Sequence, residues 1–278
     1  MFLGTLVEAQ SFLNVSSYQV GIGGSSMLGD LGGAKGKGTN FIGDFDAKST
    51  RFSGTYALDW AWTNHFEYRT SLNFIYLNAT DLNSENHDRS KRNLSVNTSI
   101  IELTPSIKYN FLSSKKIKYN KWTPHNFLNI YLTLGTGLIY FNPKATYNGK
   151  NYSLKKLTTE GQGLNDGAKE YSKLSVVIPY GVGVSKLINS NSTLFFEVIT
   201  RKCFTDYLDD VSTVYYDNKI LATVNSEESA ELADRNTSGE KFLKGTKRGN
   251  PGKNDSYFTF AFGFKKTFNA TQEYVIKF

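Results

Sequence analysis

Hydrophobic and polar residues alternate along residues 51–77 of this chain. From position 52 to position 62, aromatic and aliphatic side chains fall on nearly every second residue, with small or polar residues between them. After Thr63 and Asn64 the alternation returns over residues 66–76. A period of two places successive side chains on opposite faces of a β-strand. The segment therefore predicts two strands joined by a tight polar turn.

Three features of this hairpin favour a membrane-spanning barrel over a soluble sandwich. Each run has roughly 11 residues, which is the length that a tilted strand needs to cross a bilayer. Aromatic side chains on the apolar face, Trp60 and Tyr68 among them, gather near the turn, as in the girdle at a membrane surface. The opposite face carries full charges at Asp59, Glu67 and Arg69, in mid-strand. A polar face of this kind suits a barrel interior.

The alternation recurs outside the hairpin and predicts eight strands. Besides the two strands of the hairpin, we expect strands at 17–27, 93–111, 128–141 and 173–186, a seventh that begins near Leu194, and a last one over 258–264. In the fourth strand the phase of the pattern shifts at Ile100 and Ile101, which a β-bulge would explain. Pro105 in the same strand cannot donate to a ladder.

The connections between these strands alternate between long and short. Bacterial outer-membrane barrels have this asymmetry, with long extracellular loops and short periplasmic turns. The prediction is therefore an all-β fold, an eight-stranded antiparallel transmembrane β-barrel built as an up-and-down meander with long extracellular loops. We expect it in the outer membrane, with both termini in the periplasm. Residues 1–9 are interpreted as the remnant of a signal peptide, and residues 10–278 as one barrel domain.

Composition agrees with this fold class. Aromatic residues make up 14% of the 278 residues, which favours strands, while hydrophobic residues make up 39% and mean hydropathy is −0.38. No apolar run approaches about 18 residues, which excludes a helical membrane protein. The net charge of +7 could suit a nucleic acid partner, but the sequence contains no nucleic-acid-binding fingerprint, so we expect none. The single cysteine, Cys203, excludes an intrachain disulfide.

The polar faces of the predicted strands carry charges of both signs. An eight-stranded barrel is only wide enough for its own side chains to fill it. Charges inside so narrow a space must pair, because an unpaired buried charge carries a large desolvation cost. We therefore expect a salt-bridged plug and no open pore. The interior charges are Asp59, Glu67, Glu102 and Glu197 against Arg69, Lys108, Arg201 and Lys265.

Candidate chemistry in the loops is sparse. None of the three histidines has a serine or aspartate at a spacing that indicates catalysis, so we expect no catalytic residue, no cofactor and no enzyme activity. Asp206, Asp209 and Asp210 are weak candidates for a calcium site, and the simpler reading is that they cap local turns. Residues 226–234 suggest a short capped helix, and the basic run over 241–253 is expected to be flexible.

Several loop segments are similar to a known family. They are FNPKATYNGKNYSLKKLTTEGQG over 141–163, IPYGVGVSK over 178–186, FTDYLDDVSTVYY over 204–216, LGDLGG in the first loop and RNLS over 92–95. Together they resemble the PorG-like outer-membrane β-barrels of the type IX secretion system of Bacteroidetes. The resemblance implies a non-enzymatic component of the outer membrane. Its implied partners are the periplasmic ring proteins, a PorK-like lipoprotein and a PorN-like protein, and outer-membrane lipid.

The connection after the fourth strand is the candidate contact with the ring, because it would face the periplasm and is basic. Its charges are Lys115, Lys116, Lys118 and Lys121. Ordinary solubilising charge is the competing interpretation of these lysines. Two other functions stay open: a lipid-modifying enzyme of the outer membrane, and a simple structural or ligand-binding barrel whose loops meet something outside the cell.

Overall fold

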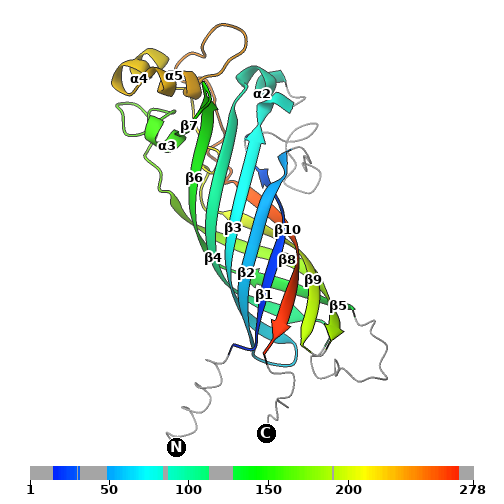
Figure 1. Ribbon diagram of the computed structural model, residues 1–278. Helices are drawn as coiled ribbons and strands as arrows, with labels where there is room; N and C mark the ends of the chain where they lie inside the picture. Colours follow the sequence, from blue (N-terminus) through cyan, green and yellow to red (C-terminus); the bar gives the residue numbers. More distant parts are fainter. Residues whose placement is uncertain are drawn as a thin grey trace, which may run out of the picture.

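A computed structural model describes residues 15–29, 31, 49–83, 87–112, 128–189 and 191–268 of the chain. Its strands form a closed ring of eight antiparallel barrel strands, with short helices gathered at one end (Figure 1). The ring closes where the first strand pairs with the last over the full length of both. The predicted fold class is confirmed. None of the helices in the described part of the chain is long and apolar enough to cross a membrane.

The bounds of the barrel strands follow the predicted segments closely. The strands are β1 (Ser17–Leu28), β2 (Arg51–Ala61), β3 (Phe66–Thr80), β4 (Ser95–Asn110), β5 (Leu128–Gly135), β6 (Gly137–Tyr147), β7 (Lys150–Ser153), β8 (Leu174–Asn189), β9 (Ser192–Cys203) and β10 (Ser256–Thr267). The helices are η3 (Asp81–Asn83), α2 (His87–Arg92), α3 (Leu154–Leu157), α4 (Asn218–Val224) and α5 (Glu227–Ala233).

β5 and β6 are one barrel strand with a break at Thr136, and β7 is a short extension that pairs with β6 alone. Both halves keep the same register against β4 and β8. The break has a cause on each side, because Thr136 lies opposite Pro105 and Gly135 lies opposite Pro179. Proline has no N–H to donate, so the ladder loses bonds there while the strand direction is kept.

The predicted bulge at Ile100 and Ile101 is wrong. β4 pairs with β3 in one unbroken register from Ser95 to Tyr109, and every even-numbered side chain of β4 is buried. What changes is the chemistry of the faces. Towards its first residues, β4 buries Val96 and Ile100 and turns serine and asparagine outwards, whereas further along it buries polar residues and exposes aliphatic ones. The sequence pattern changes phase because the environment outside the barrel changes.

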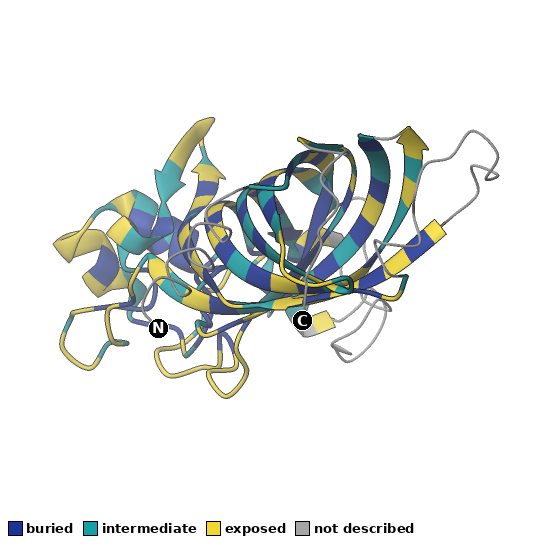
Figure 2. Ribbon diagram, turned by 90° about the horizontal axis from the view of Figure 1, so that it is seen from below, coloured by how far each residue is buried: buried dark blue, intermediate teal, exposed yellow. Residues whose placement is uncertain are grey.

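The barrel therefore has two levels. Buried and exposed residues alternate along the strands of the ring (Figure 2). At one level the outward residues are exposed and apolar, and along β4 and the residue that follows it they run from Ile101 to Phe111. Ten residues of strand tilted by about 40° span roughly 25 Å, the height of the apolar band of an outer-membrane barrel. Aliphatic and aromatic side chains all round the ring would not be stable in water over such an area, so this band contacts lipid.

The two ends of the barrel differ. At one end, which we name the turn end, β2 and β3 are joined by a tight turn in which the Thr63 hydroxyl accepts from the Phe66 amide (3.0 Å). β1 begins and β10 ends at the turn end (Figure 1). At the other end, residues 81–83, 87–94, 148–173 and 204–255 form a folded cap that carries all the helices just given (Figure 1). The cap encloses an apolar core continuous with the upper barrel, including Leu77, Phe141 and Leu208.

Candidate functional site: a filled lumen and a folded cap

Arg69 on β3 is the centre of a charge network in the part of the lumen nearer the turn end. Its Nε donates to Asp59 Oδ1 (2.9 Å) and its Nη1 to Glu197 Oε2 (3.0 Å). Its Nη2 donates to Gln19 Oε1 (3.0 Å), so each guanidinium nitrogen has a side-chain partner, from β1, β2 or β9. The Tyr131 hydroxyl also donates to Glu197 Oε2 (2.9 Å). Strands on opposite sides of the ring are thereby joined through the lumen.

A second group of charges closes the lumen nearer the turn end. Lys265 Nζ lies 2.9 Å from Asp59 Oδ2 and 2.8 Å from Glu67 Oε2, and Lys108 Nζ lies 3.5 Å from the same Glu67 oxygen. The Lys108 ammonium also sits over the Tyr131 ring, 3.9 Å from its centroid. A charged amine above an aromatic face is stabilised by the ring quadrupole. Tyr131 thus joins this group to the Arg69 network.

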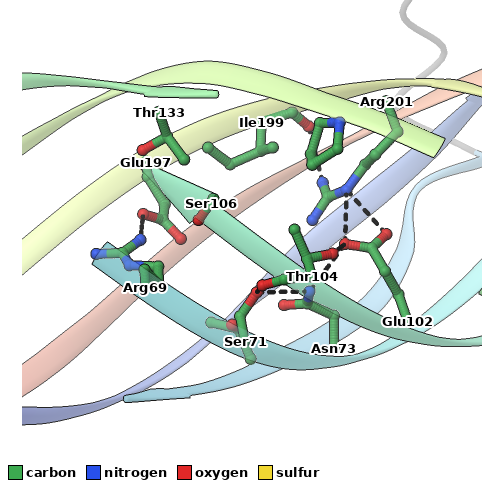
Figure 3. A pocket seen from close by; sticks show the side chains of 12 residues that line it. Arg69, Ser71, Asn73, Glu102, Thr104, Ser106, Thr133, Glu197, Ile199 and Arg201 are labelled. Carbon is green, nitrogen blue, oxygen red and sulfur yellow. Dashed lines mark hydrogen bonds and ion pairs between the residues drawn. The ribbon is translucent and has the colours of Figure 1, made fainter. Parts of the chain in front are cut away.

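Glu102 and Arg201 form a third group of charges in the lumen, on the side nearer the cap. Arg201 Nε donates to Glu102 Oε2 (3.1 Å), and the Tyr257 hydroxyl donates to the same oxygen (2.5 Å). Figure 3 shows Asn73 and Thr104 beside Glu102, and both donate to its other oxygen at 2.9 and 2.8 Å. The Glu102 carboxylate is fully buried, and both of its oxygens accept hydrogen bonds, which offsets the free-energy cost of its desolvation.

The eight charges assigned to the interior from the sequence all lie in the lumen, and each is in an ion pair with another of them. Two small cavities of about 20 and 10 Å³ lie between these side chains, the first of them drawn in Figure 3. Each is large enough for one or two water molecules. Within the described residues, the barrel interior is therefore a packed polar core.

Arg248 holds the cap together, although it lies in the run over 241–253 that was expected to be flexible. At Arg248 that expectation is wrong, because its side chain is only 3% exposed, whereas most of the other residues of the run are exposed. Its Nη1 donates to Glu160 Oε1 (2.9 Å) and to the Asp210 carbonyl oxygen, and its Nε donates to the Ala233 carbonyl oxygen (3.3 Å). One guanidinium thus ties loop 148–173 to three parts of loop 204–255.

Other polar contacts attach the remaining loops to this centre. Arg92 makes a bidentate pair with Asp81 at 2.7 and 2.9 Å, and its Nη1 donates to the Arg248 carbonyl oxygen (2.6 Å). Glu160 accepts from the amides of Ser212 (2.9 Å) and Thr213 (3.1 Å). Every donor and acceptor in this chain of contacts belongs to one of the cap segments, so these segments hold one another in place. The cap is a folded unit and not a set of separate loops.

The acidic residues considered for calcium have different partners. Asp209 accepts from the amides of Leu31 (3.1 Å) and Val211 (3.0 Å), and Asp210 accepts from the Tyr171 hydroxyl (2.6 Å) and from Thr159. Asp206 is buried nearby. The described residues contain no group of three histidine, cysteine or acidic side chains placed to hold a metal ion. Burial raises the pKa of Asp210 to about 6.

The remaining candidate residues are placed as follows. His65 Nδ1 lies 2.9 Å from the Asn110 carbonyl oxygen, and its ring stacks on Tyr109, so it stabilises the turn end. The predicted helix over 226–234 is confirmed as α5, with the Ser226 hydroxyl accepting from the Ser229 amide (3.2 Å). The basic residues Lys115, Lys116, Lys118 and Lys121 lie outside the described residues, as do residues 1–9.

Sequence reasoning missed the residues that join the networks. Tyr131 is buried on β5, but nothing in the local pattern indicates that it bridges Lys108 and Glu197. Arg248 stands among other basic residues, and no periodicity surrounds it. One signal was available for the barrel, because a large aromatic on the polar face of a strand, as at Tyr131 and Tyr257, needs a partner for its hydroxyl.

The fold and its filled interior define the class of protein: a small β-barrel of the outer-membrane type, closed by its own side chains. More particularly, the chain belongs to the family described as Domain of unknown function (DUF6089), whose model matches residues 2–230. No curated protein matches the sequence.

Similar solved structures include three barrels at low identity. Ail, the attachment invasion locus protein of Yersinia pestis, is 11% identical over 91% of this chain and 97% of Ail, with a TM-score of 0.36. The outer membrane protein OprG from Pseudomonas aeruginosa is 8% identical over 93% of this chain and 99% of OprG, with a TM-score of 0.40. Neisserial surface protein A is 10% identical over 91% and 96%, with a TM-score of 0.36. Similarity at this level carries nothing about function.

Proposed function

We propose that this protein is a non-enzymatic outer-membrane barrel that anchors or assembles the periplasmic ring of a type IX secretion system. The observation that carries the proposal is the filled lumen. The paired charges around Arg69 and Glu102 occupy the interior, so the described part of the barrel leaves no open path for a solute. A membrane barrel without a path acts through its surfaces, which is what an anchor requires.

The choice of partner rests on the resemblance of the loop segments to the PorG-like barrels. We place the turn end in the periplasm and the cap outside the cell, as short turns and long loops are arranged in outer-membrane barrels. β4 ends and β5 begins at the turn end, so the connection between them meets the periplasm in this orientation. Its lysines are the proposed contact with a PorK-like lipoprotein and its PorN-like partner.

Affinity purification from native membranes tests this function. The intact barrel is expected to retain both ring proteins under conditions that preserve the ring. A variant with glutamine at Lys115, Lys116, Lys118 and Lys121 is expected to lose them. The matched control loses the same number of charges from the cap, with glutamine at Lys241, Lys244, Lys247 and Lys253, and is expected to retain them. Recovery of the intact barrel alone would contradict the anchoring function and leave a simple structural or ligand-binding barrel.

A conductance measurement tests the premise separately. The purified barrel in a planar lipid bilayer is expected to show no steady ion current, because its interior charges are paired and packed. A stable open conductance from the intact protein would refute the filled-lumen premise, whether or not the ring proteins are retained.

A further inference from the structure

Four lysines gather on the outside of the barrel where β6 and β8 enter the cap. Lys144 lies on β6, Lys155 and Lys156 on α3, and Lys173 directly before β8. α3 lies beside the cap end of β6 (Figure 1). Lys173 is near enough to the other three to be affected by them, since its partial burial and the charges of the three neighbouring lysines lower its pKa. In the parts of the chain that the structure describes, no carboxylate forms an ion pair with any of the four.

Lys173 is held in place by neutral polar groups. Its Nζ donates to Asn142 Oδ1 (2.7 Å) and approaches Ser153 Oγ (3.4 Å), while the Ser153 hydroxyl donates to the same Asn142 oxygen (2.8 Å). Lys155 Nζ lies 5.7 Å from the centroid of the Tyr171 ring. The cluster is therefore anchored at two of its four members, while Lys144 and Lys156 are exposed. Like charges held this close repel one another, and a bound anion would remove that repulsion.

The height of the cluster on the barrel identifies the anion. Tyr140 on β6 pairs with Leu174 on β8, and both side chains are exposed members of the apolar band. Two residues further towards the cap, Asn142 begins the polar part of the same face of β6, and Lys144 follows it. A step of two residues is about 7 Å along a strand. The lysines therefore stand just above the end of the apolar band, at the level of lipid headgroups.

We propose that these four lysines bind the phosphate groups of phosphorylated lipids in the leaflet on the cap side of the membrane. A lipid fits because its acyl chains would lie against the apolar side chains of β6 and β8 while its headgroup phosphate meets the ammonium groups. Each lysine near an anionic membrane surface adds to the electrostatic attraction between the protein and the lipid headgroups. The proposal requires a membrane-embedded barrel and does not depend on the secretion ring.

Native mass spectrometry of the detergent-solubilised barrel tests the site. The probes are lipid A carrying two phosphates, the same lipid without phosphates, and inorganic phosphate. The test variant has glutamine at the four lysines of the cluster, and the control has glutamine at the four cap lysines 241, 244, 247 and 253. The intact protein and the control are expected to bind the phosphorylated lipid at least tenfold more tightly than the test variant does.

Each other outcome would overturn the assignment. Equal affinity of the test variant and the control would show that the cluster does not bind the phosphates. Equal binding of the two lipids would show that the acyl chains alone are recognised. Displacement of the lipid by inorganic phosphate at the same concentration would indicate a site for free anions. Slower migration on a denaturing gel after boiling, compared between variants, verifies that each barrel is folded.

Discussion

Replacement of Arg248 by alanine should open the cap and leave the barrel intact. The guanidinium is buried, is 2.9 Å from Glu160, and also bonds to carbonyl oxygens of Asp210 and Ala233. Its loss leaves the buried Glu160 carboxylate without its cation. Removal of one partner of a buried pair costs about 3–5 kcal/mol. Since 1.4 kcal/mol corresponds to about a factor of ten, amide protection in the cap should fall by at least about a hundredfold.

Hydrogen exchange of the refolded barrel in lipid nanodiscs measures this effect segment by segment. The amides of residues 208–216 should exchange faster, and those of β3 and β4 should not change. The matched control is Lys244→Ala, which removes an exposed ion pair with Asp166 across the same two loops (3.7 Å). Exposed pairs contribute about 0–1 kcal/mol, so this variant should resemble the intact protein. The same loss of protection in both variants, or none in Arg248→Ala, would refute the central role of the buried pair.

Three further predictions concern the barrel and the pH dependence of the cap. Gly183→Ala forces a methyl group into the ring of Tyr131, which packs on that glycine, and should lower the free energy of unfolding in urea by about 1–3 kcal/mol. The control is Gly54→Ala, where the added methyl group meets only ordinary contacts and should leave the stability unchanged. Equal urea midpoints for the two variants would contradict this prediction. Glu102→Ala should lower the free energy of unfolding by about 3–5 kcal/mol in the same assay, because it leaves the charge of Arg201 buried without a partner. The double variant Glu102→Ala with Arg201→Met should recover most of this loss, because no unpaired charge is then buried. A double variant as unstable as Glu102→Ala would count against the pairing. The pKa of Asp210 is raised from 3.8 to about 6, so its contribution favours the folded cap at low pH and is lost as pH rises through 6. Cap amides should therefore be more protected at pH 5 than at pH 8 by about 1.4 kcal/mol, and Asp210→Asn should abolish the difference; a pH dependence unchanged in Asp210→Asn would refute the assignment.

The two levels of the barrel explain why one strand can carry two opposite patterns. On β3, the inward residues change from Arg69 and Asn73 to Ile75 and Leu77, and the outward residues change from Phe74 to Asn78. Below this change lipid covers the outer face, and the interior holds polar groups. Above it water covers the outer face, and the interior becomes an ordinary apolar core. The register of β3 against β4 continues unbroken across the change.

The sequence alone was sufficient for the strands, their alternation and the inward position of the lumen charges. This information is local, because a period of two assigns each side chain to a face once the strand is recognised. The same reasoning failed at Ile100, where a change of environment was taken for a bulge. The pattern records which face is apolar, and it does not record whether the apolar face meets lipid or a core.

The tertiary structure decided which charges meet and how the loops fold. Arg69 reaches Glu197 across 128 positions of sequence, and Arg248 reaches Glu160 across 88. Such pairs depend on ring closure and on the packing of one loop against another, which leave no periodic trace in the chain. A basic run that reads as solvated in isolation can therefore contain the residue that holds the cap, because burial is a property of the neighbours that the fold supplies.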